Sequence, residues 1–210
     1  MIVSVFNLVY KSITKSWNLL KYYLYNWIFK FRLWINLVNY GSNVRCKGSV
    51  PIIWCQYGKE HDVSIGNNCT FNSYAGHSWF CKCKLMIKQN AKLTIGDNTG
   101  FNGVLIFCSN SITIGSNVKI GGGTRIFDTD HHPLDYLKRR DDNDEYTKKA
   151  PIIIGDDVFI GGNCIIGKGV IIGARSIIAA GSVVVKSIPA DCIAGGNPCK
   201  VIKNLNTDIV

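Results

Sequence analysis

An apolar residue recurs at every sixth position through much of this chain. The series is unbroken near the carboxyl end, where it comprises Ile154, Ile160, Ile166, Ile172, Ile178 and Val184. A looser series precedes it, with a slip of one residue after its third member: Ile95, Phe101, Phe107, Ile114, Ile120 and Ile126. A period of six matches neither the turn of an α-helix nor plain strand alternation. Repeats of this length are typical of a parallel β-helix, in which three repeats make one coil of about eighteen residues.

Glycine follows many of these apolar residues, as at Gly96, Gly115 and Gly155, and an earlier copy of the pattern, VSIGNNCTF, occupies residues 63–71. Each repeat would contribute one short strand and one corner, where Gly or Asn accepts a positive φ. The branched side chains would stack in columns inside a narrow core. We therefore predict an all-β body made of stacked six-residue repeats.

The chain contains nine cysteines, an odd number, and they form no CxxC pair. Neither a disulfide framework nor a zinc ribbon is expected from this arrangement. We interpret the cysteines as small buried apolar side chains in a reducing compartment. The sequence therefore predicts a cytoplasmic location and no bound metal.

The amino-terminal segment, residues 1–45, is basic and aromatic. Residues 1–59 contain eight Lys or Arg and no Asp or Glu, although the whole chain has a net charge of +10. Because the charge is concentrated at one end of the chain, nucleic acid is not the expected partner. Within residues 12–40 no charge-free run exceeds eight residues, as in Tyr22–Phe29, which is too short to span a bilayer. Two interpretations stay open: a helix packed on the body or on a neighbouring subunit, and an amphipathic helix of residues 1–40 lying peripherally in the membrane interface.

The repeat stops at residues 128–151, and about twenty polar residues take its place. This break contains HHPLD and therefore two of the four histidines of the chain, His131 and His132. Functional side chains concentrate on loops that a rigid scaffold holds in place. We predict one loop that protrudes from a corner while the coil continues beneath it.

Residues 154–202, IGDDVFIGGNCIIGKGVIIGARSIIAAGSVVVKSIPADCIAGGNPCKVI, resemble the hexapeptide-repeat acyltransferases. The resemblance is strongest to the galactoside and maltose O-acetyltransferase branch and its surface-polysaccharide relatives. It implies a left-handed parallel β-helix over residues 46–205, a short tail at 206–210, and a homotrimer whose active sites are shared between subunits. A zinc-binding branch of this fold exists, but its histidines are spread over separate coils in a pattern that this sequence does not show.

In that family the loop carries a histidine followed by proline, on which acetyl transfer depends. The matching residue here is His132, with His131 as the alternative, because several relatives have one residue fewer before the His-Pro pair. The imidazole would take the proton of a sugar hydroxyl as its oxygen attacks acetyl-CoA. Asp130 and Asp128 are candidates to hold the imidazole tautomer. Asp128 and Asn102 are also candidates for contacts with the acceptor sugar.

The resemblance also implies where the acetyl-CoA co-substrate lies, along the outside of the coil. The matching positions are Phe159, Gly162, Ala180, Val185, Lys186, Lys200 and Lys203. Relatives tend to have Thr where this chain has Val185, and Arg where it has Lys200 and Lys203. A hydroxyl contact and bidentate geometry would therefore be absent here.

The predicted function is transfer of an acetyl group from acetyl-CoA to a sugar hydroxyl. The basic aromatic amino terminus favours a lipid-linked oligosaccharide as the acceptor, in the synthesis of a capsule, O-antigen or exopolysaccharide. A small soluble sugar and an amino acceptor are alternatives. A third hypothesis, of another class, is a catalytically silent β-helix that serves as a scaffold or binding module.

Overall fold

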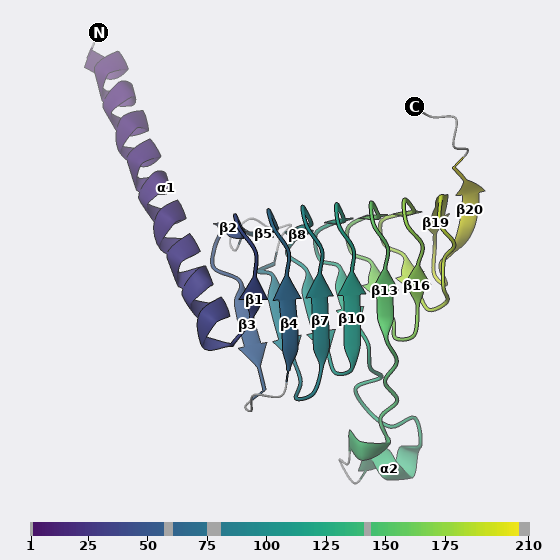
Figure 1. Ribbon diagram of the computed structural model, residues 1–210. Coiled ribbons are helices and arrows are strands. Elements are labelled where there is room, and N and C mark those ends of the chain that lie inside the picture. Colours follow the sequence, from purple (N-terminus) through teal and green to yellow (C-terminus); the bar gives the residue numbers. More distant parts are fainter. Residues whose placement is uncertain (1, 57–60, 75–80, 141–143, 206–210) are drawn as a thin grey trace.

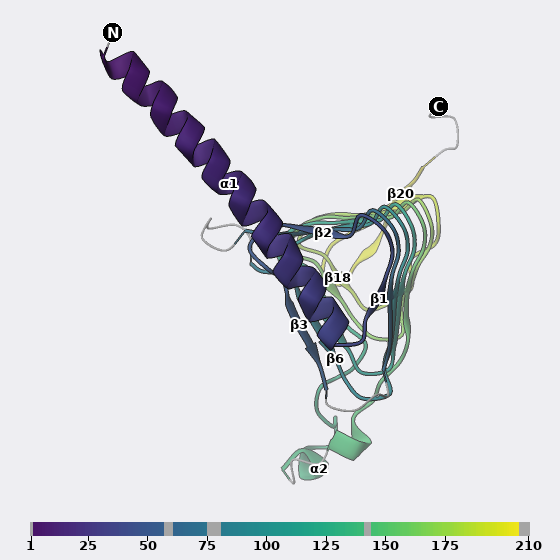
Figure 2. The ribbon, with the colours of Figure 1, turned by 60° about the vertical axis from the view of Figure 1, so that its left-hand side comes forward.

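The computed structural model describes residues 2–56, 61–74, 81–140 and 144–205. A three-sided coil of short strands forms the body, with one long helix across its amino-terminal end (Figure 1, Figure 2). A loop with two short helical segments projects from one corner of the coil (Figure 1). The body thus has the architecture of a parallel β-helix.

The strands form three sheets, one along each side of the coil (Figure 2). The first sheet contains β1 (Asn39–Tyr40), β4 (Asp62–Ile65), β7 (Lys92–Ile95), β10 (Ser111–Ile114), β13 (Ile152–Ile154) and β16 (Ile171–Ile172). The second sheet contains β2 (Arg45–Gly48), β5 (Thr70–Ser73), β8 (Gly100–Asn102), β11 (Lys119–Ile120), β14 (Phe159–Ile160), β17 (Ile177–Ile178), β19 (Cys192–Gly195) and β20 (Lys200–Asn204). The third sheet contains β3 (Ile52–Cys55), β6 (Lys84–Ile87), β9 (Leu105–Cys108), β12 (Arg125–Phe127), β15 (Ile165–Ile166) and β18 (Val183–Val184). Neighbouring strands pair in parallel, except β19 and β20, which are antiparallel.

Equivalent residues of successive coils stack directly on one another. In the first sheet Ile95 pairs with Ile114, Ile114 with Ile154, and Ile154 with Ile172. The last of these steps is eighteen residues, the length of three repeats. All four side chains are at most 2% exposed, so they form one continuous apolar column. The predicted β-helix is confirmed, whereas its handedness stays a prediction.

The core position predicted for Phe107 is wrong by one residue. Ile106 is 0% exposed and pairs with Ile126, whereas Phe107 lies half-buried on the outer side of β9. Successive side chains of a strand point to opposite faces, so a slip of one residue exchanges inside for outside. Both residues are apolar, and the corner after β9 carries extra residues, so the repeat did not reveal which one faces the core.

Asparagine and glycine both accept a positive φ at the corners, as at Gly169 (75°), but some corner glycines have a different role. Positive φ falls on Asn98 (58°) and Asn117 (59°), and the Asn98 side-chain amide donates to the Asn117 side-chain oxygen at 3.2 Å. The glycine that follows each isoleucine meets another constraint. At Gly115 a Cβ would lie 2.3 Å from the Asp156 carboxylate and 2.8 Å from the Asp156 backbone nitrogen. We predicted that Gly and Asn alike serve positive φ, but at Gly115 the close approach of the next coil requires glycine.

Helix α1 (Ile2–Ile35) closes the amino-terminal end of the coil with its last turns. Phe29 and Leu33 are both 0% exposed. The Phe29 ring packs on Phe71, with 5.4 Å between ring centroids, and Phe71 stacks on Phe101 at 4.8 Å. The helix therefore covers core side chains that would otherwise face water at the open end.

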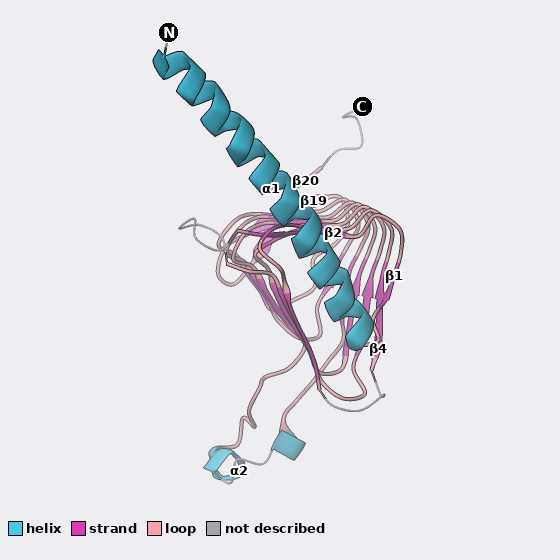
Figure 3. Ribbon diagram, turned by 90° about the vertical axis from the view of Figure 1, so that its left-hand side faces the viewer, coloured by secondary structure: helices cyan, strands magenta, loops and turns pink. Residues whose placement is uncertain are grey.

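The coil begins before residue 46, where we predicted its start. Helix α1 ends at Ile35, and Asn39 and Tyr40 of β1 already pair with β4. The amino-terminal half of α1 extends beyond the body (Figure 1, Figure 3). In the described part of the chain, no helix is both long enough and apolar enough to cross a bilayer.

Candidate active site

The projecting loop has a stem formed by its own two ends. It leaves the coil after β12 and returns at β13, and it carries α2 (Tyr136–Arg140) and the 3-10 helix η1 (Asp144–Tyr146). Thr129 and Lys149 form an antiparallel bridge across the stem. The Ala150 backbone N–H donates to the Asp128 carbonyl at 3.0 Å. The residues next to the stem are therefore held at a fixed position relative to the coil.

Asp128 fastens this stem to the preceding coil. Its side chain is 0% exposed and accepts hydrogen bonds from the backbone N–H groups of Ser109 and Asn110, each at 2.7 Å. The Cys108 thiol lies 3.6 Å from the same carboxylate, and burial followed by this negative charge raises the pKa of that thiol. A buried carboxylate with these partners has no surface to offer a sugar. The structure therefore gives Asp128 a structural contact, and its predicted roles toward the acceptor sugar and the imidazole stay predictions.

His131 and His132 follow the stem directly. His131 has φ 65°, which is uncommon outside glycine and costs about 1–3 kcal/mol. Its backbone N–H donates to the Thr129 hydroxyl at 3.2 Å. Its ring packs edge-on against Phe107 and Phe127, with centroid distances of 4.6 and 5.1 Å. The outward position of Phe107 thus supports the loop histidine, and His132 next to it is exposed.

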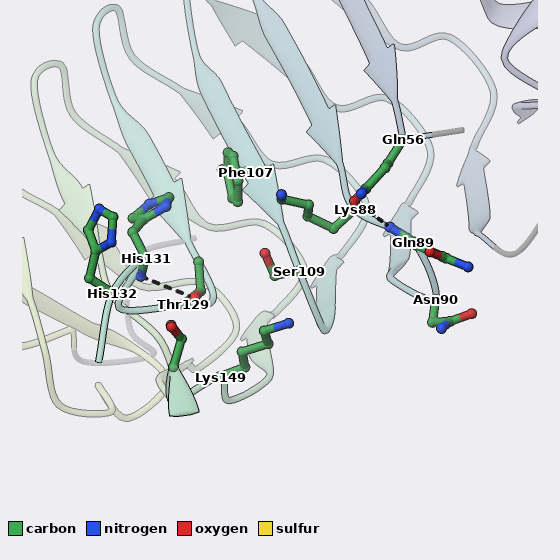
Figure 4. Close-up of a pocket in the computed structure, with 11 residues that line it drawn as sticks. Gln56, Lys88, Gln89, Asn90, Phe107, Ser109, Thr129, His131, His132 and Lys149 are labelled. Atoms are coloured by element: carbon green, nitrogen blue, oxygen red, sulfur yellow. Dashed lines mark hydrogen bonds between the residues drawn. The ribbon is translucent and has the colours of Figure 1, made fainter. Parts of the chain in front are cut away.

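Both histidines line a cavity of about 460 Å³ at the foot of the loop (Figure 4). Its wall is formed by Gln56, Lys88, Gln89, Asn90, Phe107, Ser109, Thr129, His131, His132, Thr147 and Lys149. These residues come from the ends of β3, β6 and β9 and from both strands of the stem. The cavity therefore has a rigid wall on the coil side and the loop on the other.

Asp130 does not line this cavity. Its carboxylate forms an ion pair with Lys168, which lies on the next coil at the corner from which the loop projects. The other carboxylate oxygen is buried and has no hydrogen-bond partner among the described residues. The contact that the structure gives Asp130 therefore ties the loop to the coil, and its predicted role toward the imidazole stays a prediction.

The residues predicted to bind acetyl-CoA lie on the coils after the loop, and none of them lines the cavity. Phe159, 49% exposed, is on β14 of the second sheet. Gly162 and Ala180 follow at the next corner on successive coils, where the Gly181 backbone N–H donates to the Gly162 carbonyl at 2.8 Å. These residues form one group on the second-sheet side of the coil, in which Phe159 and Ala180 are exposed and Gly162 is partly buried.

The remaining predicted acetyl-CoA residues fall into two places. Val185 and Lys186 directly follow β18 of the third sheet, at the corner that also carries the loop. Lys200 and Lys203 are exposed on β20, at the far end of the second sheet. One chain therefore does not gather the predicted acetyl-CoA residues around the histidines.

Asn102 is also remote from the cavity. It lies on β8 of the second sheet and accepts a hydrogen bond from the Asn72 side-chain amide.

The cavity residues Lys88 and Lys149 were not foreseen from the sequence. The one available signal was the slip in the repeat near Phe107, which marks the corner beside the loop. Among the described residues, no cluster of His, Cys, Asp or Glu is arranged to hold a metal ion.

Comparison with known proteins agrees with this architecture. The family described as the hexapeptide repeat of succinyl-transferase matches residues 151–186. "Putative acetyltransferase YJL218W" of Saccharomyces cerevisiae is 37% identical over 139 residues, 66% of each chain. The match thus covers just under two thirds of that protein.

Two solved structures resemble the chain as well. The Vibrio cholerae hexapeptide-repeat acetyltransferase VCA0836, solved with acetyl-coenzyme A, is 31% identical with a TM-score of 0.56, over 84% of this chain and 76% of that one. A galactoside acetyltransferase in complex with coenzyme A is 28% identical with a TM-score of 0.52, over 80% of this chain and 65% of that one. The present chain belongs to the hexapeptide-repeat acetyltransferases.

Proposed function

We propose that the protein transfers an acetyl group from acetyl-CoA to a hydroxyl of a sugar. The observation that carries this proposal is the histidine pair on a fixed stem beside a cavity of about 460 Å³, in a chain of this family. A cavity of this size accommodates one sugar unit with room for solvent. The named activity of the galactoside acetyltransferase supports a sugar acceptor.

His132 acts as the general base in this proposal. Its imidazole takes the proton of the acceptor hydroxyl while that oxygen attacks the thioester carbonyl. The C–S bond then breaks, and the departing thiolate takes the proton from the imidazolium, which restores neutral His132. His131 is the better candidate for positioning, because its ring is held between Phe107 and Phe127 whereas His132 is exposed.

Acetyl-CoA is proposed to bind across a boundary between two chains of a homotrimer. The support is geometric: the exposed group around Phe159, Gly162 and Ala180 does not reach the histidine cavity within one chain. In a closed ring with threefold symmetry, the second-sheet side of one chain can face the loop corner of its neighbour. Lys200 and Lys203 would then meet the phosphates of the cofactor.

The acceptor is proposed to be a lipid-linked oligosaccharide of surface-polysaccharide synthesis at the cytoplasmic face of a membrane. Support comes from an exposed apolar stripe on α1, whose members are 46–68% exposed: Tyr10, Ile13, Trp17, Leu20, Leu24, Trp27, Phe31 and Trp34. They lie three or four residues apart and so share one side of the helix, away from the buried Phe29 and Leu33. Aromatic rings with flanking lysines suit the headgroup region of an anionic membrane.

The catalytic proposal is tested by release of free thiol from acetyl-CoA with a panel of sugars. His132→Ala is expected to lower kcat by about 10²–10⁴-fold, the usual contribution of a general base. His131→Ala is expected to lower it less. Release by His132→Ala at the wild-type rate would reject His132 as the base, and absence of release with every sugar would favour an amino acceptor or a silent scaffold.

A further inference from the structure

Among the described residues, the wall of the histidine cavity carries positive charge and no negative charge. Lys88 and Lys149 line it, whereas none of the residues that form it is Asp or Glu. Figure 4 shows the two lysines on different segments, one on the coil and one on the loop stem, with Ser109 between them. A neutral sugar requires no such charge.

Both lysines are placed by backbone structure. Lys88 directly follows β6, and its backbone N–H donates to the Cys108 carbonyl at 2.8 Å. Lys149 is held in the stem by its bridge to Thr129. The backbone of each lysine is therefore fixed on one side of the cavity. The four methylene groups of each side chain let its ammonium group move to meet a ligand.

Two other lysines of these coils have acidic partners. Lys92 pairs with Asp62 at 2.9 Å, and Lys168 pairs with Asp130. No ion pair recorded among the described residues includes Lys88 or Lys149. Because neither Lys88 nor Lys149 has an acidic partner among the described residues, both positive charges are available to a ligand. Asn90, beside Lys88 in the same wall, adds an amide that can donate to an anion.

Resting on the proposed acetyl transfer, we infer that the acceptor sugar is anionic. A carboxylate or phosphate of the sugar lies between Lys88 and Lys149, and the hydroxyl to be acetylated points at His132. Ammonium groups bind both kinds of anion by charge-assisted hydrogen bonds. The cavity then selects acidic over neutral sugars and fixes which hydroxyl meets the base.

The experiment compares a methyl hexuronide with its neutral methyl ester, which has the same hydroxyl groups, and with the matching methyl hexoside 6-phosphate. Transfer from acetyl-CoA is measured for wild type, Lys88→Gln, Lys149→Gln and the double variant. Lys84→Gln is the matched control, because Lys84 lies on the outer face of the same strand, β6, and does not line the cavity. Binding of each sugar to the same proteins is followed in parallel by saturation-transfer NMR.

Wild type is expected to prefer an acidic acceptor by at least about tenfold in kcat/KM, equivalent to about 1.4 kcal/mol. Each glutamine variant should lose most of that preference through a higher KM for the acidic acceptor. Its KM for acetyl-CoA should be unchanged, and its rate with the neutral sugar should fall much less than its rate with the acidic one. The acidic acceptor, uronide or phosphate, whose kcat/KM falls more in the lysine variants identifies the anion that the site binds. Added salt should weaken the preference for acidic acceptors.

The inference is overturned if neutral and acidic sugars react equally well, or if the preference survives in the double variant. It is also overturned if the lysine variants raise the KM for acetyl-CoA instead, since the charges would then serve the cofactor. Lysine-dependent binding of acidic sugars without any transfer would support the anion site and reject the proposed transferase activity. The two proposals can therefore fail separately.

Discussion

At the scale of single residues, the position of the loop histidines depends on a carboxylate that never meets the cavity. Asp128 accepts two backbone N–H groups from the corner after β9, and it immediately precedes the stem residue Thr129. The same corner places Phe107 against the His131 ring. One buried acid thus connects the coil, the stem and the histidine pair.

Replacing Asp128 by asparagine is expected to destabilise the fold by about 1–3 kcal/mol. Asparagine keeps the shape but has one acceptor oxygen, so its amide would face a buried N–H donor. The free energy of unfolding in urea measures the loss. Asp62→Asn is the control, since its ion pair with Lys92 is more than half exposed and should contribute less than about 1 kcal/mol. Equal losses in the two variants would contradict the role of Asp128.

Buried thiols make stability sensitive to alkaline pH. Burial is the main cause that raises the pKa of Cys46 from 9.0 to about 11. Between pH 9 and pH 11 the unfolded thiol releases its proton while the folded one keeps it. The contribution of this group to stability is therefore complete below pH 9 and is lost as the pH rises to 11.

Wild type should accordingly lose more stability than Cys46→Ala between pH 9 and pH 11. The difference in slope should approach about 1.4 kcal/mol per pH unit. Urea unfolding at pH 8, 9, 10 and 11 measures it, and comparison with the variant removes the effect of lysines and tyrosines common to both proteins. Parallel curves for the two proteins would show that Cys46 titrates normally.

At the scale of elements, the strands could be predicted from the sequence, but the cavity could not. Stacked columns need similar side chains at a fixed spacing. The spacing of Ile154 and Ile172 therefore predicted that these two residues pair. Lys88 and Lys149 are 61 positions apart in the sequence. They line the same cavity because the corner of one coil lies beside the loop stem of a later coil. That juxtaposition depends on exact coil lengths, which the irregular corner near Phe107 conceals.

For α1 too, the sequence predicted the element but not its contacts. The helical spacing predicted an amphipathic helix, but it did not show which residues face the body. The structure buries Phe29 and Leu33 and leaves the aromatic stripe that contains Trp17, Trp27 and Trp34 exposed. Lys21 lies over the Trp17 ring at 5.3 Å, so a positive charge borders the stripe. A membrane and a second protein surface are both able to cover such a stripe.

The triple variant Trp17→Gln, Trp27→Gln, Trp34→Gln is expected to bind phosphatidylserine vesicles at least about tenfold more weakly than wild type, because apolar burial of even one large side chain contributes more than 1.4 kcal/mol. Co-sedimentation of the full-length protein measures the partition. Trp54→Gln is the control, because Trp54 is 38% exposed but lies on β3 of the body. If the triple variant instead dissociates the oligomer and wild type ignores vesicles, the stripe is a protein interface.

At the scale of the whole molecule, the two groups of residues that we propose as one active site lie apart on the chain. The loop corner carries the proposed base, and the second-sheet side carries Phe159 and Ala180. In a trimer, the loop corner of one chain could face the second-sheet side of its neighbour, so that each active site would form between two chains. Single variants cannot test this arrangement, but a mixture of two variants can.

Two inactive variants should regain activity when they are mixed within one trimer. His132→Ala removes the base, and Ala180→Glu places a carboxylate where the cofactor is proposed to pass. In mixed trimers from equal amounts, about one quarter of the boundaries would pair an intact loop with an intact cofactor surface. Thiol release after co-expression, compared with each variant alone, measures the recovery, and native mass spectrometry confirms three chains. If both halves belong to one chain, every site in the mixture is broken and no activity returns.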